Sequence, residues 1–83
     1  MEKAIALRYD ETLPAPLIVA KGADHMAERI RNLAEESGVR IVSDPLLADS
    51  LERVEVGELI PYELYAAVAE LLVFVRRMEE KSR

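Results

Sequence analysis

The sequence predicts an α/β domain, a small mixed β-sheet of about three strands flanked by helices. Three observations predict it. Short apolar or alternating segments, which favour strands, occur near the N-terminus and in mid-chain. Segments whose apolar residues recur at helical spacing lie between and after them. Glycine and proline stand where one kind of segment gives way to the other. The expected order is strand, strand, helix, strand, helix, helix.

The first two strands are predicted on either side of a loop stiffened by prolines. Lys3–Tyr9 alternates between apolar residues and small or charged ones, which is typical of a strand with one covered face. Leu17–Ala20 is a continuous apolar run and suits a central strand covered on both faces. Pro14 and Pro16 fix the backbone between them. We expect the two strands to pair in antiparallel fashion.

A helix followed by a third strand is predicted next. Lys21-Gly22 is interpreted as a turn, and a helix is expected from Ala23 to about Glu36 because apolar residues recur there at helical spacing. Gly38 ends that helix, since glycine adopts the left-handed cap conformation easily. Val39–Ser43 is expected to be a strand parallel to the second one, reached by a right-handed crossover. The face of this helix expected to meet the core is formed by Met26, Ile30, Leu33 and Ala34.

Two further helices complete the predicted domain. Asp44-Pro45 indicates a helix start, with a capping carboxylate before a proline at the first helical position. Pro61 is expected to open the last helix, which should run to about Glu79. One stripe of that helix is expected to face the core, and it consists of Leu64, Val68, Leu71, Val75 and Met78.

The last helix carries more apolar surface than one packing face requires. Tyr65, Ala69 and Leu72 lie about 100° around the helix from the centre of the core stripe. The surplus has two explanations: a helix buried deeply between sheet and neighbours, or an exposed apolar shoulder that accepts a segment of a partner protein.

The composition of the chain limits the classes of function that the protein can have. The chain has 83 residues, enough for a single domain spanning 1–83, and 51% of them are apolar. Cysteine is absent, which suits a reducing cytosol and excludes disulfides and thiolate metal sites. A net charge of −5 without a lysine or arginine run disfavours nucleic-acid binding. The longest apolar stretch is far shorter than the roughly 20 residues that span a bilayer. We therefore expect a cytoplasmic protein that reaches a membrane only through another protein.

No residue pattern nominates an enzyme. His25 is the only histidine, and no cysteine or serine elbow accompanies it. Lys21-Gly22 before a helix could hold an anion, but a lone glycine is a weak signal and a simple turn explains it. The carboxylates are interpreted as parts of a solvated surface and not as acid–base pairs. We expect no catalytic residue, no metal site and no cofactor.

Four blocks of the sequence, in this order, resemble a known family. They are AIALRYD (4–10), APLIVAKGAD (15–24), IVSDPLLADSL (41–51) and IPYELYAAVAELLVFV (60–75). They resemble the C-terminal cytoplasmic domain of the FlhB/YscU family of flagellar and type III secretion proteins, with a match from about Lys3 to Met78. The chain departs from the family pattern at Leu46, where a second proline is frequent, and at Asp49, where arginine is frequent.

The resemblance implies a docking module of the export apparatus. Its partners would be export-gate proteins and apolar segments of secreted proteins. In the family such segments bind a small hydrophobic patch, which corresponds here to Ala15, Pro16, Ala69 and Leu72. Tyr65 belongs to the same helical shoulder and is included in the predicted site.

The alternative is structural complementation. The family's self-cleaving Asn-Pro-Thr-His motif does not occur in the chain, and extending the match backward places Met1 and Glu2 at its last two positions. The strand that precedes this motif in the family has no counterpart in the sequence, which would leave a sheet edge free. The chain would then associate with itself or stand in for the C-terminal part of a truncated FlhB.

The first prediction is that the protein does not cleave itself, because the sequence lacks the Asn-Pro pair at which the family's chain breaks. Purified protein incubated at neutral and at alkaline pH should give a single species by intact-mass spectrometry. A discrete internal cleavage product would contradict this expectation.

Overall fold

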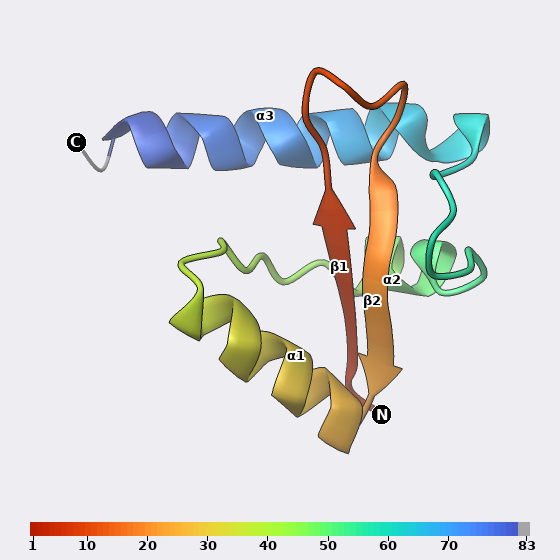
Figure 1. The fold of residues 1–83 in the computed structure, drawn as a ribbon, viewed down its shortest axis with the longest axis vertical. Helices are drawn as coiled ribbons and strands as arrows, with labels where there is room; N and C mark the ends of the chain where they lie inside the picture. Colours follow the sequence, from red (N-terminus) through yellow and green to blue (C-terminus); the bar gives the residue numbers. More distant parts are fainter. Residues whose placement is uncertain (82–83) are drawn as a thin grey trace.

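The sheet contains two antiparallel strands in the computed structural model, which describes residues 1–81. Strand β1 is Lys3–Arg8 and strand β2 is Leu17–Ala23 (Figure 1). The pairing runs from Lys3 opposite Ala23 to Arg8 opposite Leu17, with a register shift between Ala6 and Leu7. The antiparallel pairing of the first two predicted strands is confirmed.

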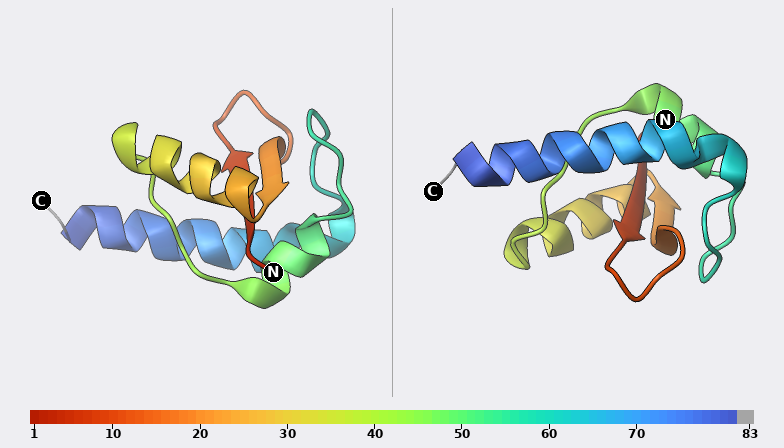
Figure 2. Two further views of the ribbon diagram at one scale, coloured as in Figure 1. Left: turned by 90° about the horizontal axis from the view of Figure 1, so that it is seen from below. Right: turned by 90° about the horizontal axis from the view of Figure 1, so that it is seen from above.

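Helix α1, His25–Glu36, covers one face of this sheet (Figure 2). Its Ala27 is fully buried, and its axis passes close to β2 at Gly22. A β-carbon added at Gly22 would lie only 2.6 Å from the β-carbon of Met26. Glycine is therefore required here so that the helix and strand backbones can approach each other.

The opposite face of the sheet is covered by α2, Pro45–Leu51, and by α3, Tyr65–Lys81 (Figure 2). A short 3-10 helix, η1, Tyr62–Leu64, leads into α3. Asp44 caps α2 as predicted, since its carboxylate accepts a hydrogen bond from the Leu47 amide at 3.1 Å. None of the helices within residues 1–81 is both long and apolar enough to cross a membrane.

The core lies between the sheet and the pair α2 and α3. Ile18 of β2 and Val68 of α3 are completely buried and belong to one cluster of buried side chains. Three members of the predicted α3 stripe besides Val68 are half-buried, whereas Met78 remains 38% exposed. The other buried members of the cluster are Ala15, Leu47, Leu51 and Ile60.

The predicted third strand is wrong. Residues 39–44 form neither a strand nor a bridge, and the sheet is therefore purely antiparallel and not mixed. Val39 and Ile41 are 57% and 40% exposed, so the apolar run that suggested a strand is not buried. No described residue pairs with 39–44 through the ladder of backbone hydrogen bonds that a strand requires.

The predicted turn at Lys21-Gly22 is also wrong, because β2 continues through both residues. The strand is extended by its pairing: the Asp24 amide donates to the Glu2 carbonyl at 2.8 Å, and the Glu2 amide donates to the Asp24 carboxylate. Asp24 then turns the chain with a positive φ of 53°, and α1 begins at His25 instead of Ala23. Gly22 thus serves helix packing and not a loop.

The face that α1 turns to the core differs from the predicted one. Met26 and Leu33 are 50% and 63% exposed, whereas Ile30 and Ala34 are half-buried. Arg31 lies on the packed side and forms an ion pair of 2.6 Å with Glu2 at the start of the sheet. A two-stranded sheet is too narrow to cover the whole apolar width of the helix.

We predict that Gly22→Ala destabilises the domain by about 1–3 kcal/mol, because the new methyl group overlaps Met26 unless helix and strand move apart. Urea unfolding monitored by circular dichroism would measure the change. Ala23→Ser, at the exposed neighbouring position, is the matched control and should change the free energy of unfolding little. Equal stability of the Gly22→Ala variant and the control would contradict the close approach of α1.

Candidate protein-docking surface

The predicted shoulder of α3 presents Tyr65 and Ala69 to solvent. Tyr65 is 42% exposed, and Ala69 is exposed one helical turn further on. Leu72 follows on the same side, since positions separated by three or four residues share a helix face. It is half-buried and packs against the core cluster. The shoulder therefore changes gradually from open surface at Tyr65 to core at Leu72.

Ala15 and Pro16 lie beneath the surface. The Ala15 side chain is 2% exposed and belongs to the core cluster, and Pro16 is buried as well. The Pro16 carbonyl accepts a hydrogen bond of 2.9 Å from the amide of Ile60. This bond ties the loop before β2 to the chain that leads into α3. Of the five predicted site residues, Ala15 and Pro16 are buried, and we call this pair the floor of the site. The side chains open to a partner are Tyr65, Ala69 and part of Leu72.

Leu71 and Leu72 are more similar in burial than the helical pattern predicts. Both are half-buried, and both pack against the same core cluster. These neighbouring residues lie on adjacent flanks of α3, so both flanks are partly covered. A charge at Leu72 is consequently expected to weaken folding as well as binding, and Ala69 is the better position at which to separate the two.

Tyr62 extends this surface and is a residue that sequence reasoning missed. Its side chain is 80% exposed, and its ring lies 5.4 Å from that of Tyr65 at an interplanar angle of 55°. The spacing of three residues could have identified the pair, but the 3-10 turn that brings the rings together is decided by the fold. We call Tyr62, Tyr65, Ala69 and Leu72 the α3 surface.

The loop between the strands is held in shape by its own hydrogen bonds. The Asp10 carboxylate accepts bonds from the Thr12 hydroxyl, from the Thr12 amide at 2.8 Å and from the Arg8 guanidinium at 3.2 Å. These bonds, first of all those from Thr12, lower the pKa of Asp10. Since the loop ends at Ala15-Pro16, its rigidity would keep the floor of the α3 surface in place.

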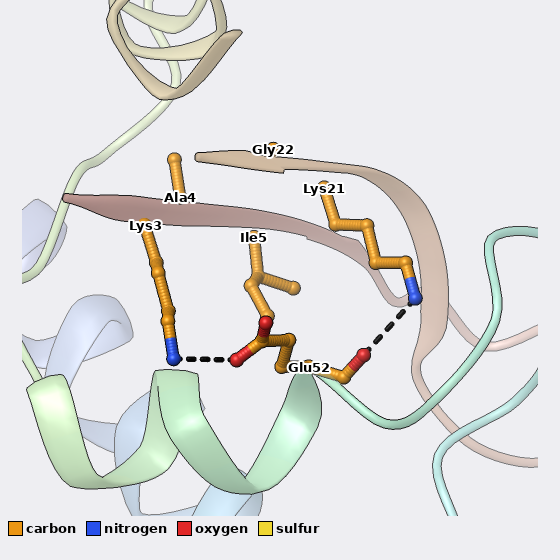
Figure 3. Close-up of a pocket in the computed structure, with 6 residues that line it drawn as sticks. All are labelled: Lys3, Ala4, Ile5, Lys21, Gly22 and Glu52. Carbon is orange, nitrogen blue, oxygen red and sulfur yellow. Dashed lines mark hydrogen bonds and ion pairs between the residues drawn. The ribbon is translucent and has the colours of Figure 1, made fainter. Parts of the chain in front are cut away.

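Polar side chains at the start of β1 and near the end of β2 join the sheet to α2. The Lys3 amine lies 2.8 Å from the Asp49 carboxylate and 2.5 Å from that of Glu52, and these hydrogen bonds raise the pKa of Lys3. The Lys21 amine donates to the carbonyl oxygens of Glu52 and Val54 at 3.0 and 3.1 Å (Figure 3).

A cavity of about 190 Å³ lies between these groups. Every cation in Figure 3 already has a partner on α2 or just beyond it, so the arrangement fastens the helix to the sheet and leaves no charge aimed at a ligand. The lining residues are Lys3, Ala4, Ile5, Lys21, Gly22 and Glu52.

The outer edge of β1 carries no second strand within the described part of the chain. Because the Glu2 carbonyl is bonded to the Asp24 amide, alternation places Ala4 and Ala6 toward β2. The backbone groups of Lys3 and Ile5 then point to the outer edge. The outer edge of β2 differs, since Ile18 exchanges two backbone hydrogen bonds with Gly57 and Glu58.

The structure gives no support for the alternative chemical sites considered from the sequence. His25 is an exposed residue at the first position of α1. Lys21 and Gly22 lie in a strand and do not form an anion-binding turn. Within residues 1–81, no three His, Asp or Glu side chains are grouped so that they could hold a metal ion.

Known proteins resemble this chain in sequence along nearly all of its length. Residues 1–75 match the family described as FlhB HrpN YscU SpaS. The flagellar biosynthetic protein FlhB of Bacillus subtilis is 44% identical over 94% of this chain, but the match covers 22% of FlhB. The chain thus spans about a fifth of the length of the FlhB proteins it matches. The uncharacterized protein YlqH of Bacillus subtilis is 37% identical, with 96% of this chain and 87% of YlqH covered.

Solved structures resemble it in fold as well. The C-terminal domain of PscU has a TM-score of 0.85 and 36% identity, covering 89% of this chain and 96% of that domain. The cytoplasmic domain of FlhB from Shewanella putrefaciens has a TM-score of 0.84 and 37% identity, covering 98% of this chain and 69% of that domain. With the two-stranded sheet and its three α-helices, these matches establish that the chain belongs to the FlhB HrpN YscU SpaS family and has the fold of its C-terminal cytoplasmic domain.

Proposed function

We propose that this protein is a non-enzymatic docking domain of the flagellar or type III export apparatus, and that it works in the cytoplasm. It binds apolar segments of exported proteins or of export-gate components at the α3 surface. The observation that carries the proposal is a row of exposed side chains along η1 and α3, Tyr62, Tyr65 and Ala69, in a chain of this family.

Exposure and rigidity support this assignment. Tyr62 and Tyr65 offer large rings to solvent, although neither belongs to the buried cluster that holds the fold together. Ala69 leaves space between Tyr65 and Leu72 for an incoming side chain. The floor at Ala15 and Pro16 is fixed by packing, so little conformational entropy is lost when a partner binds.

Burial of a charge at the contact provides the test. We predict that Ala69→Asp weakens binding of an apolar export-substrate peptide by at least about tenfold, since an unpaired carboxylate would enter the contact. The melting temperature should change little because Ala69 is exposed. Peptide titration followed by fluorescence anisotropy, beside a thermal melt of each variant, measures both.

Ala67→Asp is the matched control, because Ala67 is an exposed alanine on the other side of the same helix. It should bind the peptide like the unchanged protein. Val68→Asp should unfold the domain, because Val68 is completely buried. Equal binding by the Ala69→Asp and Ala67→Asp variants would remove the α3 surface as the docking site.

The open edge of β1 favours a second candidate function. A strand from another polypeptide could pair with the outward backbone groups of Lys3 and Ile5. The partner would be a second copy of this chain or a truncated FlhB. The chain would then complete a sheet in addition to, or instead of, offering the α3 surface.

Backbone amide exchange tests this second candidate. When a soluble fragment of a truncated FlhB is added, the amides of Lys3 and Ile5 should become protected, whereas those of Ala4 and Ala6 should be protected before and after. Sedimentation over a range of concentrations would detect pairing between copies. Unchanged exchange at Lys3 and Ile5, together with a monomer at all concentrations, excludes pairing at this edge.

A further inference from the structure

Two stretches of the chain that are joined at the edge of β2, the second of which contains η1 and most of α3, carry no positively charged residue. Residues 9–20 and 54–75 include no lysine, arginine or histidine. They are joined by backbone hydrogen bonds, from Ile18 to Glu58 at 3.0 Å and from Ile60 to Pro16 at 2.9 Å. The carboxylates in these stretches are Asp10, Glu11, Glu55, Glu58, Glu63 and Glu70.

Most of this negative charge is uncompensated. Asp10 is paired with Arg8, but the five glutamates are exposed and take part in no salt bridge within residues 1–81. The cations that border the two stretches are Arg8, Lys21, Arg53 and Arg76, and of these Lys21 is directed to the end of α2. Two of the glutamates, Glu63 and Glu70, are exposed and stand directly beside Tyr62 and Ala69 in the chain, and we call them the acidic rim of the α3 surface.

An aromatic pair stands at the same end of that surface. Tyr62 is 80% exposed and contributes nothing to the buried core, yet its ring contacts that of Tyr65. Glu63 lies between the two tyrosines in sequence. Aromatic faces attract ammonium and guanidinium groups, and an exposed carboxylate attracts the same groups by its charge. Charge and ring chemistry at this end of the surface thus favour the same kind of ligand group.

We propose that the α3 surface selects segments in which a lysine or arginine stands beside an apolar anchor. The apolar anchor packs over Ala69 and Leu72, and the cation lies against the Tyr62–Tyr65 pair near Glu63. This inference rests on the proposed docking function and adds its specificity. Segments flanked by acidic residues are disfavoured because they meet the acidic rim.

Two short labelled peptides test the selection. They share one apolar centre and differ only in their flanks, which are lysine in one and glutamate in the other. The lysine peptide should bind at least about tenfold more tightly at low ionic strength, and added salt should reduce this difference because the rim is exposed to solvent.

Variants locate the selection on the structure. Glu63→Gln should weaken binding of the lysine peptide by about threefold to fivefold and should not weaken binding of the glutamate peptide. Tyr62→Ala should weaken binding of the lysine peptide by more than it weakens binding of the glutamate peptide, because it removes an apolar contact for both and a cation site for the first alone. Glu36→Gln, at an exposed position of α1, is the matched control for Glu63→Gln and should have no effect. Thermal melts of all variants should coincide, since none of these side chains is buried.

The outcomes separate this inference from the docking function. If both peptides bind with equal affinity at every salt concentration, charge selection is overturned and docking remains. If the preference exists but Tyr62→Ala and Glu63→Gln leave it unchanged, the assigned position is overturned. If neither peptide binds at all, both the selection and the proposed docking function fail.

Discussion

A two-stranded sheet is only marginally stable in water, so this domain depends on the elements that cover both faces of β1 and β2. On one face, the missing side chain of Gly22 lets α1 approach the strand backbone. On the other face, Ile18 and Val68 are buried in one cluster that joins the sheet to α3. Each layer therefore gains its stability from contact with the next, and the sheet is the layer that both sides share.

This dependence determines where a partner can bind. Ala15 and Pro16 are used to close the core, and Leu72 is partly used in the same way. What remains of the predicted site for a ligand is the row formed by Tyr62, Tyr65 and Ala69, at the N-terminal end of α3. Because the supporting loop is fixed by Asp10 and by packing, this surface is already in place before a partner arrives.

The α3 surface and the β1 edge suit different partners. An exposed apolar helix face accepts side chains, and its specificity comes from anchors and charge. A strand edge accepts a backbone, and it would fix a partner by a ladder of hydrogen bonds. The two surfaces are built from different groups, side chains of α3 in one case and the backbone of β1 in the other, so mutation of one tests it independently of the other.

Local patterns in the sequence determined the elements whose signals do not depend on distant residues. Alternation marked β1, and Asp44-Pro45 marked the start of α2, because strand faces and helix caps are decided over a few residues. The sequence also predicts the core-facing stripe of α3 around Val68, since helical periodicity shows which residues share a face.

Tertiary structure alone decided the rest. Val39–Ser43 has the composition of a strand, but a strand needs a neighbour to bond with, and no described residue supplies one. Gly22 resembles a turn residue in sequence, and only the approach of α1 gives it a different role. The depth of Leu72 and the pairing of Tyr62 with Tyr65 depend on how α3 is seated and entered. Helical periodicity predicts the direction in which each side chain leaves the helix axis. Contact with other elements decides how deeply that side chain is buried.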